Sequence, residues 1–342
     1  MAVYDHVMVS SSDNCKAVRV LGGILNNSIH DDPHYEELTG LVRTKKCVVF
    51  VGSGLSLGHY PSWGSLVYRL GTACGLDVSG WQEKERDAEL LMRRSDEARA
   101  KDSQQYCTTL ATAFGQPVVS TRLAYDRIMR LPFGSYVTSN FDPLLAIEST
   151  KPENACFGVY SYPDLPSHKI GQRCLFYIHG YVERSPATPR PDQLILCATD
   201  FEQAYSETSS ALPSFLKQLF TYHPILFIGC GLREPSLRNV FEICRRIRKK
   251  IESQREHEAP RRFILLPIAY RSELKAGAGS GISERDLKAE AAESAYFLEL
   301  DILVVRYDKR DEKYSGLEEI LDEWCELPPV EIKSGFEGAN LE

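Results

Sequence analysis

The sequence contains no CxxC pair. Its ten cysteines are scattered singly along the chain, and several of them lie in apolar runs such as Cys47–Val51. Zinc ribbons and disulfide-rich scaffolds both depend on closely spaced cysteines. The pattern therefore predicts reduced, buried thiols and no zinc site.

Long hydrophobic runs are also missing. Runs such as Cys47–Val51 and Ile225–Ile228 are far shorter than the roughly 20 apolar residues that cross a bilayer. The first residues show no basic segment followed by an apolar one, so we expect no secretion signal. These absences predict a cytoplasmic protein that does not associate with membranes.

An excess of positive charge is absent as well, since the formal net charge is −7. Such a balance does not favour binding of nucleic acid through the whole-chain field. One cationic stretch stands out, and we expect it to be a solvated helix face, with docking of an acidic partner or a nucleic acid as the alternative. It comprises Arg245, Arg246, Arg248, Lys249, Lys250, Arg255, Arg261 and Arg262.

What is present is an ordinary globular composition in which short apolar runs alternate with helical patterns. This alternation predicts an α/β fold with a Rossmann-like, doubly wound and mostly parallel sheet. Helices are expected over Tyr35–Lys46, Trp81–Phe114 and Ser236–Ile251. The expected strands are Cys47–Val51, Ser135–Thr138, Cys174–His179, Leu194–Cys197, Ile225–Gly229, Phe263–Pro267 and Ile302–Tyr307.

The domain organisation expected from these patterns is simple. Residues 1–34 lack periodicity and form an N-terminal arm, and the polar residues 328–342 form a C-terminal tail. A single domain covers 35–327, with a helical insertion at about 76–130.

The first expected strand ends in a glycine loop, Gly52-Ser53-Gly54-Leu55-Ser56. Glycines allow a phosphate to approach the backbone closely, and a following helix would present free N–H groups to it. The loop is neither a GxGxxG fingerprint nor a Walker A loop. A tight strand-to-helix turn without a ligand explains it equally well.

Polar residues follow two further strands. Asn140 and Asp142 come after Thr138, at the strand end where open α/β sheets bind ligands, although either side chain could instead cap the helix at Pro143–Ile147. His179 closes another strand beside Gly180 and has the side chain best suited to a general base near neutral pH, although a lone His is more often a core residue.

A second glycine segment, Gly229-Cys230-Gly231, follows the strand at Ile225 and offers another close backbone approach. The order of these elements (glycine loop, T-x-N-x-D, H-G and G-x-G-L), together with Pro61-Ser62-Trp63, resembles the sirtuin family. The variant Pro-Ser-Trp is similar to the bacterial sirtuin-like branch associated with antiphage defence.

The resemblance implies a role for each matching position. Asn140 would orient the attacking water, Asp142 would hold the nicotinamide carboxamide and His179 would act as general base. Gly52, Ser53, Gly54 and Ser56 would cradle the NAD⁺ diphosphate and inner ribose. The remaining cofactor-binding positions would be Trp63, Thr138, Gly229, Cys230, Gly231 and Tyr307, with Val305–Tyr307 at the adenine end.

The departures from the family concern the protein-substrate side. The segment after His179 is too short for the zinc module of deacylating sirtuins and contains no CxxC pair. Water then becomes the natural acceptor, so we expect an NAD⁺ glycohydrolase that acts in abortive antiphage defence. The alternatives are ADP-ribosyl transfer, an NAD⁺- or ADP-ribose-binding scaffold subunit, and a deacylase. The family further implies a homo-oligomer and a HerA-like ATPase partner.

Overall fold

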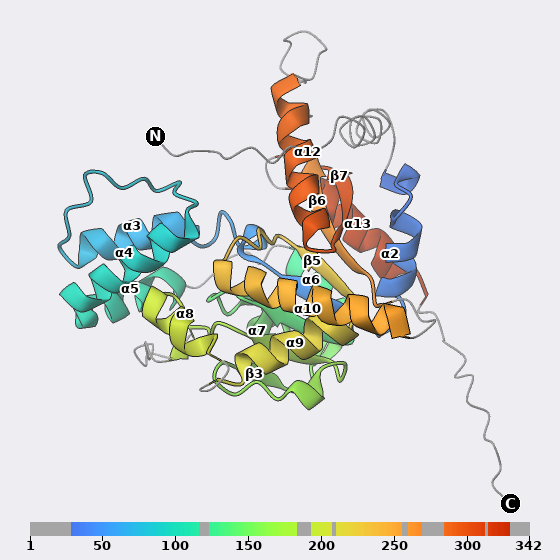
Figure 1. The fold of residues 1–342 in the computed structure, drawn as a ribbon, viewed down its shortest axis with the longest axis horizontal. Helices are drawn as coiled ribbons and strands as arrows, with labels where there is room; N and C mark the ends of the chain where they lie inside the picture. The colour runs from blue at the N-terminus through green and yellow to red at the C-terminus, as the bar shows by residue number, and fades with distance from the viewer. Residues whose placement is uncertain are drawn as a thin grey trace, which may run out of the picture.

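A parallel sheet forms the centre of the fold (Figure 1). The computed structural model describes residues 29–115, 123–182, 193–206, 210–254, 259–268, 284–311 and 314–328. The sheet has seven strands in the order β3-β4-β2-β1-β5-β6-β7. They are β1 Val48–Val51, β2 Ser135–Thr138, β3 Val159–Ser161, β4 Cys174–Tyr177, β5 Ile225–Ile228, β6 Arg262–Ile268 and β7 Leu303–Asp308.

The strand order is that of a Rossmann fold with one additional edge strand. Without β3, the six remaining strands follow the 3-2-1-4-5-6 order of dinucleotide-binding sheets. The chain moves outward from β1 in one direction and then returns to start β5 on its other side. Ligands of such sheets bind at this reversal point, outside the carboxyl ends of the central strands.

The register places these carboxyl ends at one level. Val51 of β1 pairs with Thr138 of β2 and with Ile228 of β5, and Thr138 pairs in turn with Tyr177 of β4. The four predicted motifs therefore leave the sheet side by side, although more than 170 residues separate the first from the last.

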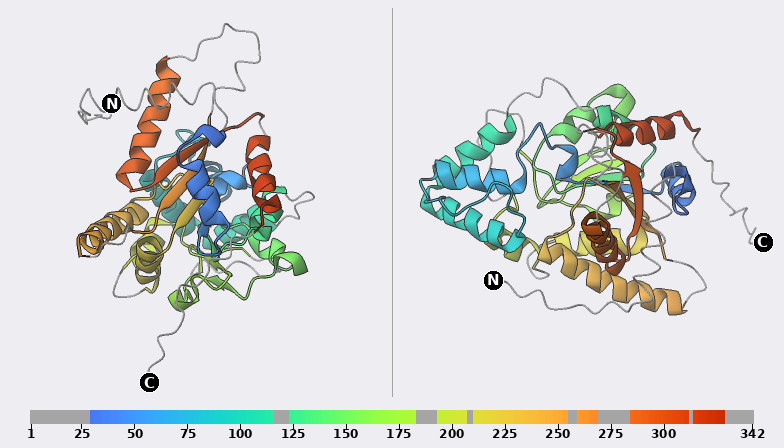
Figure 2. Two further views of the ribbon diagram at one scale, coloured as in Figure 1. Left: turned by 90° about the vertical axis from the view of Figure 1, so that its right-hand side faces the viewer. Right: turned by 90° about the horizontal axis from the view of Figure 1, so that it is seen from above.

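Helices cover both faces of the sheet, as a doubly wound fold requires (Figure 2). The face with Val49 and Val51 packs on α2 Tyr35–Val42, α6 Leu123–Arg130, α7 Leu144–Glu148 and α13 Ser315–Glu326. The face with Val48 and Phe50 packs on α9 Leu212–Tyr222, α10 Pro235–Gln254 and α12 Glu284–Glu299. The central strands β1 and β5 are fully buried, which explains their unbroken apolar sequence.

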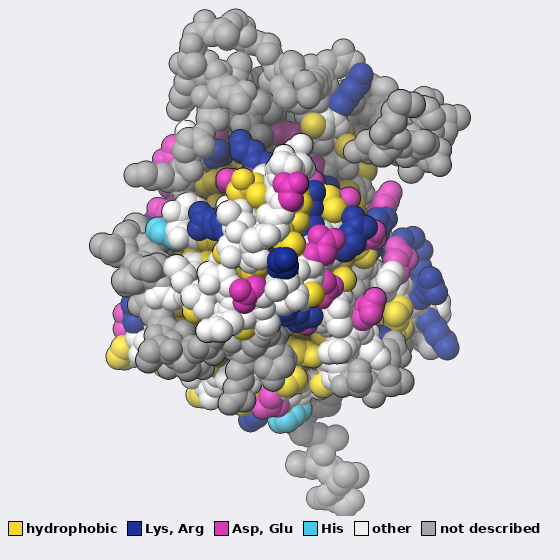
Figure 3. Space-filling view, turned by 90° about the vertical axis from the view of Figure 1, so that its left-hand side faces the viewer, with side chains coloured by type: hydrophobic (Ala, Val, Ile, Leu, Met, Phe, Trp, Pro, Cys, Tyr) yellow, Lys and Arg dark blue, Asp and Glu magenta, His cyan; other side chains and the backbone are white. Residues whose placement is uncertain are grey.

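Three helices form a group beside the sheet: α3 Trp63–Ala73, α4 Ala88–Lys101 and α5 Ser103–Gly115 (Figure 1). The short helix α8 Ala198–Ala204 joins this group to the sheet by packing on α4. On this side of the molecule basic and acidic side chains are interspersed rather than gathered by sign (Figure 3). Four 3₁₀ turns complete the described elements: η1 Ile29–Asp31, η2 Ser53–Leu55, η3 Pro152–Asn154 and η4 Ser167–Lys169.

Two predictions about strands were wrong. Leu194–Cys197 forms no strand. Its apolar side chains fill both cores, while its backbone N–H groups bond to the His179 carbonyl and the Asp200 carboxylate rather than to a neighbouring strand. An apolar run signals burial, and burial does not require a strand. The edge strand β3 was missed, since it is only three residues long and Val159 is exposed.

Two predictions about charged segments need correction. The helix expected over Trp81–Phe114 begins only at Ala88 and breaks at Asp102, whose extended backbone separates α4 from α5. The cationic stretch is not a wholly solvated face, because Arg248 and Arg262 are buried and donate hydrogen bonds to backbone carbonyls. Arg255 lies outside the described residues, as do most of the expected arm and tail.

The cysteines agree with the prediction of free thiols. All nine in the described residues are free, and seven of them are buried. Among the described helices, none is both long enough and apolar enough to span a membrane.

Candidate functional site

The glycine loop after β1 packs directly against the segment after β5. The Gly52 N–H donates to the Ile228 carbonyl and the Gly54 N–H donates to the Gly229 carbonyl, each at 2.9 Å. A Cβ atom on Gly52 would lie 2.3 Å from the Gly229 oxygen, which is far inside van der Waals contact. Gly229 itself has a positive φ of 68°, which favours glycine. These three glycines thus allow two loops to meet.

This packing changes the role expected for the loop. No long helix follows it directly, because the loop forms the turn η2 and α3 begins only at Trp63. The N–H groups of Gly52 and Gly54 are already used, whereas that of Ser53 makes no hydrogen bond within the described residues. Ser53 is exposed, so its N–H is the group of this loop that a phosphate could reach.

Ser56 is the centre of a buried hydrogen-bond network. Its hydroxyl donates to Oδ2 of Asp142 at 2.6 Å and accepts from Nδ2 of Asn140 at 3.2 Å. The hydroxyl of Tyr125 on α6 lies 2.6 Å away, and Tyr125 was not predicted from the sequence. Because Ser56 has a single proton and gives it to Asp142, Tyr125 is the donor in its own bond. The network fixes both side chains from β2 against the loop from β1.

Asn140 is buried and only half satisfied. Its backbone N–H donates to the Thr138 hydroxyl at 3.0 Å, and that hydroxyl donates to the Val51 carbonyl at 2.7 Å. Thr138 therefore ties β2 to β1. The Oδ1 atom of Asn140 is buried and has no hydrogen-bond partner among the described residues. Such an acceptor costs about 1–3 kcal/mol unless a ligand or water satisfies it.

Asp142 accepts a hydrogen bond on each of its carboxylate oxygens. Its Oδ2 atom accepts from Ser56, and its Oδ1 atom accepts from the Leu144 N–H at 3.1 Å, at the start of α7. Burial raises the pKa of Asp142, and these hydrogen bonds oppose the rise. The carboxylate therefore both caps a helix and faces the site.

His179 lies at the end of β4 and is 2% exposed. Its Nε2 atom is 3.0 Å from the Tyr205 hydroxyl, and the ring packs edge-on against Phe201 of α8. Burial lowers the pKa of His179 to about 3, so the imidazole is neutral at physiological pH. A buried imidazole of this kind can bond to a ligand, but it holds a transferred proton poorly.

The structure brings six of the predicted residues, including Asn140, Asp142 and His179, into one cavity with an empty volume of about 590 Å³. Trp63 lines it with its indole stacked on Phe201, and the buried Nε1 atom of Trp63 has no partner among the described residues. One acidic residue was missed, because Glu234 had been taken only as part of a helix start. The predicted residues that line this first cavity are Ser53, Ser56, Trp63, Asn140, Asp142 and His179.

A second cavity of about 740 Å³ lies on the other side of the glycine loop. Gly54, Gly229, Cys230 and Tyr307, all predicted to bind the cofactor, line it. Gly231 is exposed and lines neither cavity. Thr138 bonds within the sheet, and Gly52 lies in the contact between the two loops. The predicted residues are therefore divided between two cavities that share one loop.

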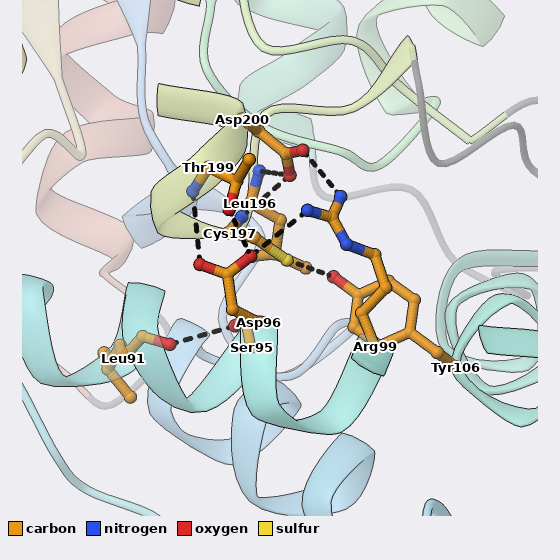
Figure 4. A network of polar contacts seen from close by, with 9 residues as sticks. All are labelled: Leu91, Ser95, Asp96, Arg99, Tyr106, Leu196, Cys197, Thr199 and Asp200. Carbon is orange, nitrogen blue, oxygen red and sulfur yellow. Dashed lines mark hydrogen bonds and ion pairs between the residues drawn. The ribbon is translucent and has the colours of Figure 1, made fainter. Parts of the chain in front are cut away.

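A polar network joins α4 of the helix group to α8, whose Phe201 lines the first cavity (Figure 4). Arg99 of α4 bonds to Asp200 of α8 at 2.6 Å, and Asp96 accepts from both the backbone and the hydroxyl of Thr199. Asp200 also accepts from the N–H of Cys197, which closes the first turn of α8. These contacts hold the helix that places Phe201 and Tyr205 around His179.

Within the described residues, no three His, Cys, Asp or Glu side chains lie together in a way that could hold a metal ion.

Comparison with known proteins gives two matches. The family model of the SIR2-like domain matches residues 134–283. Defense-associated sirtuin 2 of Bacillus subtilis is 23% identical over 216 residues, which cover 63% of this chain and 21% of that protein. The chain thus spans about a fifth of the length of this relative. The matched domain includes β2, β4 and β5, whose carboxyl ends supply Asn140, His179 and Glu234.

Proposed function

We propose that the chain binds NAD⁺ at the loop between the two cavities and hydrolyses the nicotinamide–ribose bond, because residues 134–283 match the SIR2-like domain. The nicotinamide half would occupy the first cavity and the adenosine half the second. The reversal point of a Rossmann sheet, with one loop shared by both cavities, supports a ligand with two halves.

The observation that carries the proposal is the Oδ1 atom of Asn140, which is buried without a hydrogen-bond partner in the described structure and belongs to a residue that lines the first cavity. An acceptor at this position can orient a water molecule toward the ribose carbon. Nδ2 is held by Ser56, so the amide cannot turn freely and Oδ1 stays directed away from that bond. Orientation of the nucleophile is a large part of such catalysis.

The chemistry needs little acid assistance, because nicotinamide leaves NAD⁺ as a neutral molecule. Positive charge develops on the ribose instead, and buried acceptors facing it stabilise the transition state. Asp142 would accept a hydrogen bond from the nicotinamide carboxamide, and the neutral His179 would bond to a ribose hydroxyl. With its pKa lowered to about 3, His179 is a weak base for the attacking water.

The biological setting is proposed from the relative's name. A sirtuin-like chain of antiphage defence that hydrolyses NAD⁺ would deplete the infected cell of this cofactor. The scaffold alternative would bind NAD⁺ tightly without turnover.

The test is to incubate the purified chain with NAD⁺ and to measure nicotinamide and ADP-ribose by chromatography. We expect release of both products, and a loss of at least about 100-fold in Asn140→Ala. Asn154→Ala is the matched control, because Asn154 is equally buried but bonds to Asp126 away from both cavities. Equal rates in the two variants would contradict the site, and a tight NAD⁺ complex without products would favour the scaffold.

A further inference from the structure

Glu234 is the acidic residue of the first cavity that no predicted motif includes. It follows Leu232 and Arg233 after β5 and directly precedes Pro235, the first residue of α10. Its side chain lines the same cavity as Asn140 and His179. A glutamate at this position usually accepts a bond from a helix N–H. Here burial is the single cause that acts on its pKa, so no such bond holds the carboxylate within the described residues.

Glu234 shares its cavity with His179 and acts electrostatically on Tyr205, the partner of His179. Its charge contributes to raising the pKa of Tyr205, whose hydroxyl lies 3.0 Å from Nε2 of His179. The same charge raises the pKa of Cys230 after β5 and of Tyr296 on α12. Asp142 and His179 line the same cavity, and the cations Arg233 and Arg238 lie over the Tyr296 ring.

We propose that the Glu234 carboxylate is the general base of the reaction, an inference that rests on the proposed hydrolysis of NAD⁺. As the C1′–N bond breaks, nicotinamide leaves with the bonding electron pair and the water oxygen forms a bond to C1′. One proton of that water passes to a carboxylate oxygen of Glu234, which later releases it to solvent. The products are nicotinamide, ADP-ribose and one proton.

The division of labour with His179 follows from their two environments. Burial raises the pKa of Glu234 to about 7 and lowers that of His179 to about 3. A base works best when its pKa lies near the operating pH, which favours the carboxylate. His179 and Tyr205 then position the substrate without changing their protonation.

The test compares Glu234→Gln, Glu234→Asp and the wild type in nicotinamide release across pH 5 to 9. We expect kcat/KM of the wild type to fall below pH 7 as the base becomes protonated. Glu234→Gln should lose about 100-fold in kcat/KM together with this acid limb, and Glu234→Asp should keep the limb. Glu242→Gln is the matched control, because Glu242 is on α10, the helix that Glu234 directly precedes, pairs with Arg245 and lines neither cavity.

Azide distinguishes a base from a structural residue, since this anion attacks C1′ without losing a proton. Added azide should restore nicotinamide release in Glu234→Gln but not in Asn140→Ala. A Glu234→Gln variant with wild-type rates and an unchanged acid limb would overturn the inference and leave the hydrolysis intact, and so would a loss that azide fails to restore. A wild-type chain that releases no nicotinamide would overturn the proposed hydrolysis and the inference with it.

Discussion

The two cavities beside the glycine loop differ in what lines them. The first contains Asn140, Asp142, His179 and Glu234, whereas the second is mostly apolar, with Leu265, Leu266 and Leu317 around Tyr307. Burying polar groups costs stability, and the first cavity contains more of the titratable groups for which that cost is high. In the proposed reaction, the first cavity would surround the bond that breaks and the second would hold a flat apolar group.

The titrating groups show the same asymmetry. In the first cavity burial raises the pKa of Asp142 and Glu234 and lowers the pKa of His179. Groups with shifted pKa values that share a cleft are typical of catalytic sites. In the second cavity, burial raises the pKa of Cys230, which keeps this thiol protonated and unreactive.

The largest effect is expected from a change in the loop contact that lies between the two cavities, because such a change should disturb both of them. Gly52→Ala would place a methyl group 2.3 Å from the Gly229 oxygen, so the two loops must separate. We expect a loss of about 3 kcal/mol in the free energy of unfolding, as for overpacked cores. Chemical denaturation measures this loss.

Gly231→Ala is the matched control for this change. A Cβ atom on Gly231 would meet nothing closer than the Arg233 side chain at 3.9 Å. We expect a change of less than about 0.5 kcal/mol in the free energy of unfolding. Equal losses of stability in the two variants would show that the close contact between Gly52 and Gly229 does not determine the effect.

The second prediction separates the two serines of the glycine loop. Ser56→Ala removes a bond from Asn140, Asp142 and Tyr125, and we expect it to cost about 2 kcal/mol of unfolding free energy. Ser53→Ala alters an exposed side chain and should cost less than about 0.5 kcal/mol. Thermal or denaturant unfolding of the pair tests whether the network is as tightly coupled as its geometry indicates. Equal stabilities would contradict it.

The third prediction concerns pH and the opposite shifts of His179 and Glu234. His179 should make the fold less stable as pH falls from 6.5 toward 3, because the unfolded chain takes up a proton that the folded one refuses. Glu234 should make it less stable as pH rises from 4.5 toward 7, because the unfolded carboxyl ionises first. Between pH 4.5 and 6.5 the two slopes therefore oppose each other.

Glu234→Gln removes one of these slopes. Relative to the wild type, the free energy of unfolding of this variant should rise more steeply with pH, by about 1.4 kcal/mol per unit between pH 5 and 6.5. Urea denaturation at several pH values measures the slopes, and Glu242→Gln controls for the loss of a charge on α10. Parallel curves for Glu234→Gln and the wild type would show that Glu234 ionises as it does in water.

The sheet and the ends of its strands were predicted well, because a few neighbouring residues are enough to mark a buried strand or its end. Unbroken apolar runs such as Val48–Val51 predict buried parallel strands, and polar residues after Thr138 mark a carboxyl end. Parallel neighbouring strands end at the same edge of the sheet. The residues that follow them, Ser56, Asn140 and His179, therefore meet in one cavity. Leu194–Cys197 was wrongly predicted as a strand because its apolar run is buried by side-chain packing and does not pair with a neighbouring strand.

What the sequence could not predict depends on contacts between distant segments. Tyr125 reaches Ser56 from α6, and nothing in its own neighbourhood distinguishes it from any helical tyrosine. Glu234 stands where a helix begins in the sequence, and only its burial beside the first cavity suggests the role proposed above. The glycines after β1 predicted a phosphate cradle, yet their shape complements a second loop that follows β5.

The smallest effect is expected from a change in the second cavity, which tests whether the two cavities have different roles. Tyr307→Leu should raise KM for NAD⁺ about tenfold and leave kcat nearly unchanged, because a binding contact far from the reacting bond stabilises ground state and transition state alike. Tyr307→Phe keeps the ring and should stay close to wild type. Asn140→Ala should show the opposite division, with kcat falling and binding retained. If Tyr307→Leu lowered kcat instead, the second cavity would take part in the chemistry and the two sides of the loop would act as one site.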